Sequence, residues 1–316
     1  MIKIIDLFCG LGGFRIAFEK LGCKCVFSSD IDKYVRETYF NNFGEYPAGD
    51  ITQIQAEESP DFDILCGGFP CQPFTTAGKR GGFSDTRGTL FFEVARILKE
   101  KQPKAFFLEN VRGLTNHDKG NTLSTIMHVL DDIGYDTTYK VINAKNCGHP
   151  QNRDRWYCVG FRKDMGVDIN SFNFPTKTPL TKTLKDIIQL TASNEYQITE
   201  TARKNIDKHI ALKEIDVDEI TLAYDIRPSR CHFSTNGISP CLTAKMGTGG
   251  NNVPVVVAQN RKLTEQECLA IMGFPNDYKI GTGYQSYKQL GNSVVVPVIF
   301  QIATEIVNIL KPHDCV

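Results

Sequence analysis

The sequence lacks several features that mark whole classes of protein. No apolar stretch reaches the roughly 18 residues that a membrane span needs, and the N-terminus has no signal-peptide pattern. None of the eleven cysteines stands in a Cys-x-x-Cys pair, which disfavours a zinc ribbon. Cys9, Cys25, Cys66 and Cys158 lie in or beside apolar runs and are expected to be buried thiols. These absences favour a cytoplasmic protein with neither a disulfide framework nor a metal site.

The sequence also lacks a net charge, which by itself argues mildly against a nucleic-acid partner. The charges are unevenly distributed, however. Residues 30–63 hold nine acidic and two basic side chains, whereas residues 220–262 hold five basic and one acidic. A polyanion would be repelled by the first stretch and attracted to the second. Charge runs of this size are also typical of ordinary solvated surfaces, so the pattern alone does not decide between the two.

Apolar runs that alternate with helical patterns indicate the fold class. Strands are expected at 2–8, 25–29, 64–66 and 105–108, and helices at 14–21, 35–43, 89–99 and 123–133. Such alternation predicts an α/β fold, a Rossmann-like and mostly parallel sheet with helices on both faces. Residues 139–143 and 156–161 are expected to form a closing antiparallel hairpin.

The pattern changes after about residue 174, where a Pro-Thr-Lys-Thr-Pro run suggests a linker. Residues 180–260 have weak periodicity, and 246–252 are expected to form a loop. We therefore predict a catalytic domain from 1–174 and 285–316, and a smaller, irregular, β-rich domain from 175–284. The apolar run 294–310 is expected to be a helix that docks back on the first domain.

Glycines follow the first predicted strand, in the run Asp-Leu-Phe-Cys-Gly-Leu-Gly-Gly-Phe at 6–14. They allow a sharp turn and a close approach to a ligand at the carboxyl edge of the sheet. Asp30 lies twenty residues after Gly10, where a carboxylate accepts hydrogen bonds from ribose hydroxyls. This spacing suits NAD, FAD and S-adenosylmethionine alike. The full Gly-x-Gly-x-x-Gly pattern is absent because Arg15 stands three residues after Gly12, and a glycine turn without any ligand stays open.

Prolines frame one cysteine in the run Gly-Gly-Phe-Pro-Cys-Gln-Pro at 67–73. Pro70 and Pro73 stiffen the backbone on either side of Cys71, which favours a nucleophilic thiol over a merely buried one. Residues 75–87 contain three glycines, a lysine and two arginines, and are interpreted as a mobile basic lid.

Two polar clusters are expected near this cysteine. Glu109 follows the strand 105–108, and a carboxyl group there is a candidate general acid. Gln151, Arg153 and Arg155 would share one face if that stretch is extended. A helix cap for Glu109 and a surface salt-bridge strand for the arginines are the ordinary alternatives.

Together, in this order, these pieces resemble the cytosine C5-methyltransferase family, and in particular its compact bacterial restriction-modification type. The resemblance covers residues 1–165 and 255–310 closely. It implies that Ala270 replaces a usual arginine three residues after Glu267, which removes one local salt bridge. It implies binding of S-adenosylmethionine, with S-adenosylhomocysteine as product, by Phe8, Gly10, Leu11, Gly12, Asp30, Ile31, Asp50, Ile51, Leu90, Asn292, Ser293 and Val294. It implies catalysis by Pro70, Cys71, Glu109, Arg153 and Arg155.

The resemblance further implies a reaction in which Cys71 adds to C6 of a flipped cytosine so that C5 attacks the methyl group. Glu109 would supply a proton or a hydrogen bond to N3 of the cytosine, and Arg155 would polarise its O2 atom. No residue is a strong candidate for the base that removes the C5 proton, and a water molecule is one option. Contacts to double-stranded DNA are expected from Gln72, Thr75, Lys79, Arg80, Arg87, Arg227, Arg230, His232, Lys245 and Asn251.

Arginine and lysine favour guanine, so a short GC-rich site is expected. The chain is expected to be a monomer, and a restriction endonuclease for the same site is an expected partner. Three other functions stay open at this point: methylation of tRNA cytosine, repression of transcription by a non-catalytic DNA-binding protein, and, remotely, dinucleotide oxidoreduction. The intact Cys71, Glu109 and Arg155 argue against the second, and the framed cysteine is left unexplained by the third.

Overall fold

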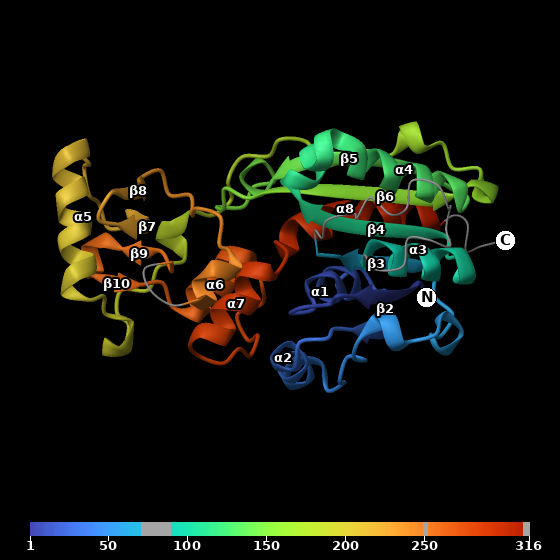
Figure 1. The fold of residues 1–316 in the computed structure, drawn as a ribbon, viewed down its shortest axis with the longest axis horizontal. Helices are drawn as coiled ribbons and strands as arrows, with labels where there is room; N and C mark the ends of the chain where they lie inside the picture. Colours follow the sequence, from blue (N-terminus) through green and yellow to red (C-terminus); the bar gives the residue numbers. More distant parts are fainter. Residues whose placement is uncertain (71–89, 249–251, 312–316) are drawn as a thin grey trace.

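The computed structural model describes residues 1–70, 90–248 and 252–311. Figure 1 shows two lobes, a larger one built on a six-stranded sheet and a smaller one built on a four-stranded sheet. Helices α6 (Glu265–Met272) and α7 (Tyr284–Asn292) lie between them. The strands of the large sheet stand in the order β2-β1-β3-β4-β6-β5. Their bounds are β1 Lys3–Leu7, β2 Lys24–Ser29, β3 Ile64–Gly68, β4 Ala105–Val111, β5 Tyr135–Asn143 and β6 Asp154–Arg162.

The large sheet is mostly parallel, as predicted. β2, β1, β3 and β4 run in one direction, while β6 pairs antiparallel with both β4 and β5. The predicted closing hairpin is therefore confirmed as β5 and β6. Because β6 runs against β4, its first residues lie at the edge where the parallel strands end. Val111, the last residue of β4, stands opposite Arg155.

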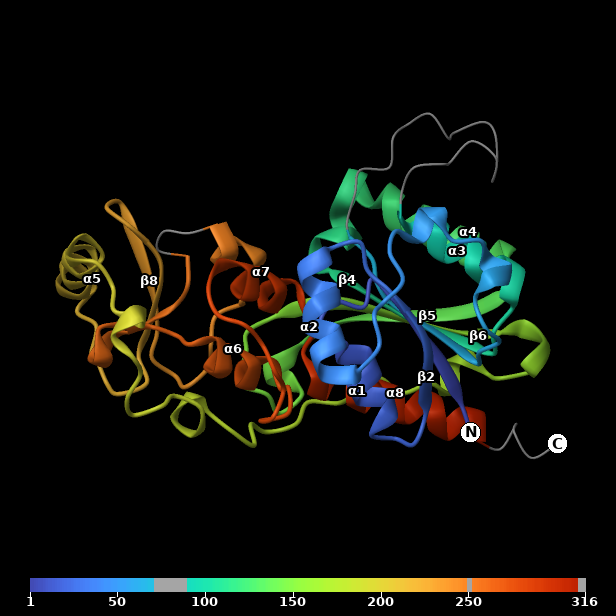
Figure 2. The same ribbon diagram turned by 90° about the horizontal axis from the view of Figure 1, so that it is seen from below.

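Helices cover both faces of this sheet, because neighbouring residues of each strand point to opposite sides. Ile4 packs in one apolar cluster with helices α1 and α8, and Ile5 packs in a second cluster with α3 and α4. Figure 2 shows α1 and α8 together on one side and α3 and α4 on the other. The bounds are α1 Gly13–Glu19, α2 Lys33–Phe43, α3 Leu90–Lys101, α4 Asn121–Asp132 and α8 Val296–Leu310.

Helix α8 corrects one expectation from the sequence. The segment Tyr284–Leu310 is long and apolar enough to cross a membrane by length and composition, although no such stretch was expected. It forms two helices, α7 (Tyr284–Asn292) and α8, and 61% of its most apolar window is buried. The apolar residues of α8 pack against α1 and the sheet, so the predicted docking of this helix on the first domain is confirmed.

The smaller lobe holds an antiparallel sheet in the order β10-β9-β7-β8. Its own apolar core is small, with Ile206, Ala223 and Val255 among its six buried members, and the rest of the lobe shares the large cluster around α8. The exact division into 1–174 with 285–316 and 175–284 stays a prediction. The bounds are β7 Leu222–Arg227, β8 Arg230–Ser234, β9 Val255–Val256, β10 Arg261–Lys262, α5 Glu200–Lys213 and α6 Glu265–Met272.

Two parts of this lobe are more regular than predicted. Helix α5 lies in a stretch expected to be irregular, where Thr199 caps its first turn and only Ala202, Ile206 and His209 are buried. Such a narrow apolar stripe gives a weak periodic signal. The expected loop at 246–252 begins instead inside a 3₁₀ helix, Ala244–Thr248, because Met246 is buried and the segment packs closely on α7.

Candidate active site

The carboxyl ends of β1, β2, β3 and β4 and the start of β6 meet at one edge of the large sheet and open on a cavity of about 430 Å³. Helix α7 forms the opposite wall. Eight of the residues predicted to bind the cofactor line this cavity: Phe8, Gly10, Asp30, Ile31, Asp50, Ile51, Leu90 and Asn292. Four of those predicted to act in catalysis line it as well: Pro70, Glu109, Arg153 and Arg155.

The turn between β1 and α1 brings a backbone N–H to Asp30. Gly10 and Gly12 have positive φ angles of 52° and 74°, which glycine adopts at little cost. The backbone N–H of Gly10 donates to Oδ2 of Asp30 at 3.0 Å, and that of Asp32 donates to Oδ1 at 2.9 Å. The carboxylate is thereby fixed in the cavity wall with lone pairs left on both oxygens. Burial raises the pKa of Asp30, while these two N–H groups lower it in part.

Beside Asp30, the side chain of Ile31 is 73% exposed although it is apolar, and it lines the cavity. An exposed aliphatic side chain at a cavity wall offers a flat apolar contact for a ring. Asp50 lies further along the same wall, where its Oδ1 accepts from the backbone N–H of Thr52 at 3.0 Å and from its hydroxyl at 2.9 Å. These contacts orient the Asp50 carboxylate.

Glu109, near the end of β4, forms an ion pair with Arg155 of β6, with 2.9 Å between Oε1 and Nε. Glu109 is only 8% exposed. Burial raises its pKa, and the positive charges of Arg155 and Arg153 oppose that rise only in part. A buried carboxyl group with a raised pKa, held against a guanidinium group, is a candidate for proton transfer.

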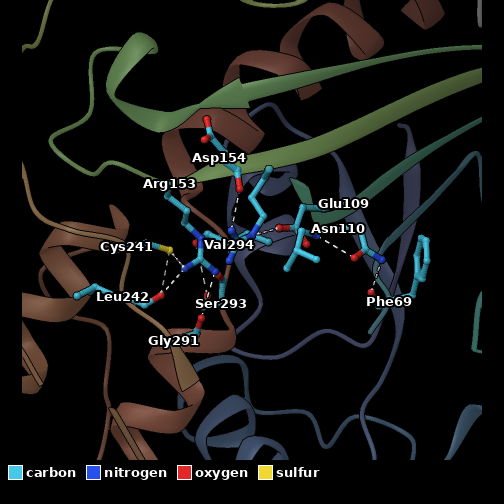
Figure 3. A network of polar contacts seen from close by, with 12 residues as sticks. Phe69, Glu109, Asn110, Arg153, Asp154, Cys241, Leu242, Gly291, Ser293 and Val294 are labelled. Carbon is cyan, nitrogen blue, oxygen red and sulfur yellow. Dashed lines mark hydrogen bonds and ion pairs between the residues drawn. The ribbon is translucent and has the colours of Figure 1, made fainter. Parts of the chain in front are cut away.

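Asn110, the next residue, connects the ends of two strands. Its side-chain amide donates to the Phe69 carbonyl at 2.8 Å, and its Oδ1 accepts from the Val111 backbone N–H at 2.8 Å (Figure 3). The end of β3, which leads into Pro70, is thereby held next to Glu109. Asn110 was not among the predicted site residues, although its position directly after Glu109 was a usable signal.

Arg153 is placed differently from Arg155, although both line the cavity. Its guanidinium group donates to the carbonyls of Leu242 at 2.5 Å, Ser293 at 2.6 Å and Gly291 at 3.1 Å (Figure 3). These carbonyls belong to the smaller lobe and to the α7–α8 connection. We infer that Arg153 is a positioning residue that joins three segments.

Gln151 is fully buried, and its amide donates to the Ile271 carbonyl at 3.0 Å, at the end of α6. A shared face for Gln151, Arg153 and Arg155 was expected only if this stretch is extended. β6 begins at Asp154, so the strand includes Arg155 alone of the three, and their side chains reach different neighbours. Of the three, only Arg155 makes an ion pair with Glu109 within the described ranges.

Four residues predicted at the cofactor site do not line the cavity: Leu11, Gly12, Ser293 and Val294. They are buried behind its wall. A Cβ atom on Gly12 would lie 2.5 Å from Phe43, and the Leu11 carbonyl accepts from the Tyr278 hydroxyl at 2.7 Å. Leu11 and Gly12 therefore pack on the side of the β1–α1 turn that faces away from the cavity.

Helix α7 contributes lining residues that the sequence analysis missed, Lys288 and Gln289. The Nζ atom of Lys288 lies 2.9 Å from Oδ2 of Asp32 and so connects α7 to the end of β2. Gln289 stands one helical turn before Asn292, so the three-residue spacing was the signal that would have found it.

Two of the residues predicted to contact DNA already interact with other side chains of the protein. Arg230 pairs with Asp225, with 2.5 Å between Nε and Oδ2, and Arg227 donates to Oδ1 of Asn252 at 2.7 Å. Lys245 is exposed, as is His232, whose ring stacks on Tyr224. Seven predicted site residues lie outside the described residues: Cys71, Gln72, Thr75, Lys79, Arg80, Arg87 and Asn251.

Comparison with known proteins decides the family. The model of the C-5 cytosine-specific DNA methylases matches residues 2–308, nearly the whole chain. The chain belongs to this family. The resemblance noted in the sequence is thereby confirmed, and DNA cytosine methylation is the activity of the chain.

Curated relatives align over most of their length. The Type II methyltransferase M.HpaII of Haemophilus parainfluenzae is 45% identical, over 93% of this chain and 86% of the relative. The Type II methyltransferase M.HhaI of Haemophilus parahaemolyticus is 40% identical, over 99% of this chain and 97% of the relative.

Solved structures support the fold at low sequence identity. A putative DNA modification methyltransferase from an Escherichia coli prophage has a TM-score of 0.75 at 20% identity, with 98% of this chain and all of that chain covered. DNMT2 of Spodoptera frugiperda has a TM-score of 0.74 at 22% identity, with 97% and 100% covered. These two structures establish the fold class alone.

Family membership implies dependence on S-adenosylmethionine, and the cavity fits that molecule. Asp30 and Asp50 supply carboxylate acceptors, and Ile31 supplies an apolar contact. Two buried atoms in the wall, Oγ of Ser29 and Oε1 of Gln289, have no hydrogen-bond partner within the described part of the chain. Buried polar groups are rarely left unpaired, so both atoms suit a polar ligand.

Proposed function

We propose that the chain transfers a methyl group from S-adenosylmethionine to C5 of a specific cytosine in double-stranded DNA. The observation that carries this proposal is the pair of the buried Glu109 and the partly buried Arg155, in the wall of the same cavity as Asp30 and Ile31. A cytosine ring bound beside Glu109 would contact both this carboxyl group and the Arg155 guanidinium group. A cofactor bound at Asp30 would lie in the same cavity as that ring.

The proposed reaction begins with addition of the Cys71 thiolate to C6 of the cytosine, which forms a sulfur–carbon bond and makes C5 nucleophilic. Glu109, the carboxyl group whose pKa is raised by burial, donates a proton to N3 as electron density moves into the ring. Arg155 polarises O2 at the same time. S-adenosylmethionine, when bound, would supply an electrophilic methyl group for C5, with S-adenosylhomocysteine as the leaving thioether. Loss of the C5 proton to water, with return of the N3 proton to Glu109, then lets the bond between Cys71 and C6 break, which releases the thiolate.

Approach to C6 requires that the cytosine leave the base stack, so we propose base flipping. In the proposed complex the smaller lobe holds the DNA, with Lys245 and His232 as its described exposed candidates and Arg227 and Arg230 free to exchange their present partners for phosphate or guanine. We further propose that the protein acts as a monomer in the cytoplasm beside an endonuclease of the same specificity.

The proposal is tested by incubating the purified chain with S-adenosylmethionine labelled in its methyl group. Duplex DNA and tRNA are supplied in separate reactions, and plasmid from expressing cells is sequenced after bisulfite treatment. We expect label in duplex DNA and protected cytosines at one short sequence. Cys71→Ser should abolish transfer and leave DNA binding intact. Label in tRNA alone, or undiminished turnover by Cys71→Ser, would refute the proposal.

A further inference from the structure

One arginine beside the mouth of the cavity has no role in the proposed reaction. Arg112 follows Val111, the last residue of β4, whose side chain lines the cavity and is 41% exposed. The side chain of Arg112 itself is 65% exposed. The buried Arg153 connects segments of the chain, whereas an exposed guanidinium group beside a cavity can bind an anionic ligand that approaches from the solvent.

The guanidinium group of Arg112 is oriented by an ion pair at the start of β6. Its Nη1 atom lies 3.2 Å from Oδ2 of Asp154, and Oδ1 of Asp154 accepts from the side-chain amide of Asn143 at 3.0 Å. Asn143 is buried, and its own Oδ1 accepts from the backbone N–H groups of Lys145 and Arg153. The carboxylate that faces Arg112 is therefore fixed to the edge of the sheet.

Most of the hydrogen-bonding capacity of this guanidinium group is unused. It carries five N–H donors, and among the residues that the structure describes its hydrogen bond is to Asp154. Because both partners of this ion pair are open to solvent, the pair contributes little to stability and can be exchanged at small cost. A guanidinium group with unused donors matches the two unesterified oxygens of a phosphodiester.

The position of Arg112 suits a phosphate of the strand that carries the target cytosine. Glu109 and Arg155 are the proposed partners of the flipped base, and Val111 stands opposite Arg155 in the sheet. Residues of a strand advance by about 3.3 Å each, so the backbone of Arg112 lies roughly 10 Å beyond that of Glu109. A nucleotide whose base is bound at Glu109 keeps its phosphate outside the cavity, where Arg112 is exposed. We propose that Arg112 binds a backbone phosphate next to the flipped cytosine, so that the larger lobe also holds the DNA.

This inference rests on the proposed function, and its test separates the two. The DNA is a duplex oligonucleotide with the sequence that bisulfite sequencing identifies, and its binding to the full chain is measured at several salt concentrations with S-adenosylhomocysteine present. Arg112→Gln removes the charge, so it should weaken duplex binding about 10-fold. It should also lower the slope of log Kd against log salt concentration by about 1, since one phosphate contact is lost. Arg112→Lys should keep that slope because it keeps the charge.

Methylphosphonate linkages locate the contact, because each one removes the charge of a single phosphate. A methylphosphonate next to the target cytosine should weaken duplex binding by the parent protein. In Arg112→Gln the same linkage should add little further loss, as expected for two changes that remove one interaction. Both Arg112 variants should bind S-adenosylhomocysteine without DNA as the parent protein does, which verifies that they are folded.

Arg203 provides the matched control. It lies on α5, at the end of the smaller lobe away from the large sheet, and pairs with Asp207 at 2.9 Å (Figure 1). Arg203→Gln should leave duplex affinity and its salt dependence unchanged. An Arg112→Gln protein with the parental affinity and slope, or a loss that adds in full to that of every methylphosphonate, would overturn the inference alone. A parent protein that binds neither S-adenosylhomocysteine nor duplex DNA would overturn the proposed function itself.

Discussion

Replacement of Arg153 by methionine is expected to destabilise the protein far more than replacement of Arg155 does. Arg153 is 3% exposed, and its donors satisfy the carbonyls of Leu242, Gly291 and Ser293. Methionine keeps the apolar stem and removes all three donors. Each buried carbonyl left without a donor costs about 1–3 kcal/mol. The variant no longer has to bury the charged guanidinium group, and this gain offsets part of the total cost of the three carbonyls. We expect Arg153→Met to lower the free energy of unfolding by about 3–5 kcal/mol, a large share of the roughly 5–15 kcal/mol of a typical protein.

The assay is urea unfolding followed by tryptophan fluorescence. The chain has one tryptophan, Trp156, which is fully buried on β6 three residues after Arg153. With a slope of about 3 kcal/mol per molar urea, the midpoint should fall by about 1 M or more. Arg155→Met, the matched variant, leaves Glu109 without its partner, but this carboxyl group can protonate because its pKa is raised. Arg155→Met should therefore destabilise the protein less than Arg153→Met does and lose methyl transfer. An Arg153→Met protein that unfolds at the parental midpoint would refute the assignment of Arg153 as a positioning residue.

Three further predictions follow from the buried groups. Because burial raises the pKa of Glu109, the single-turnover rate of methylation should fall as pH rises through that pKa. Glu109→Gln should lower the rate about 10²–10⁴-fold and remove this pH dependence. A parental rate that does not change with pH would contradict the role of Glu109 as an acid. Burial also raises the pKa of Asp6 well above its usual value, so its contribution to stability is full below the unfolded-state pKa and is lost as pH rises through the folded-state pKa. The urea midpoint of Asp6→Asn should therefore rise relative to that of the parent protein as pH increases above the unfolded-state pKa of aspartate, and a difference between the two midpoints that does not change with pH would count against it. A Cβ atom on Gly291 would overlap the backbone of Thr243 and Ala244, so Gly291→Ala should lower the free energy of unfolding by about 1–3 kcal/mol in the same assay, and an unchanged midpoint would disprove the close contact.

Local patterns in the sequence were sufficient to predict the large sheet and many of the residues at its carboxyl edge. The alternation of apolar runs and helical spacings predicted each parallel strand, because each strand and helix buries a face that its own residues define. The glycine turn at 10–12, Asp30 and Glu109 follow predicted strands directly. Since parallel strands end at one edge, their positions in the chain implied that Asp30 and Glu109 lie at one site.

Other features depended on contacts between distant parts of the chain. Glu267, in the motif where Ala270 replaces a usual arginine, forms a buried ion pair with Arg261, with 2.7 Å between Oε1 and Nη2. The different roles of Arg153 and Arg155 arise because carbonyls from residues 242, 291 and 293 converge on one guanidinium group and not on the other.

The sequence by itself determined the fold class of the catalytic domain, the reaction family and the main acidic residues of the cavity. These depend on periodicity and on short motifs, whose physical causes are local. Only the tertiary structure decided that Arg155 faces Glu109, that Arg153 joins the segments around it, and that Gln289 lines the cavity with an acceptor unpaired within the described residues. A hydrogen bond or a buried orphan atom is defined by what surrounds it, and that environment is assembled from residues far apart in the chain.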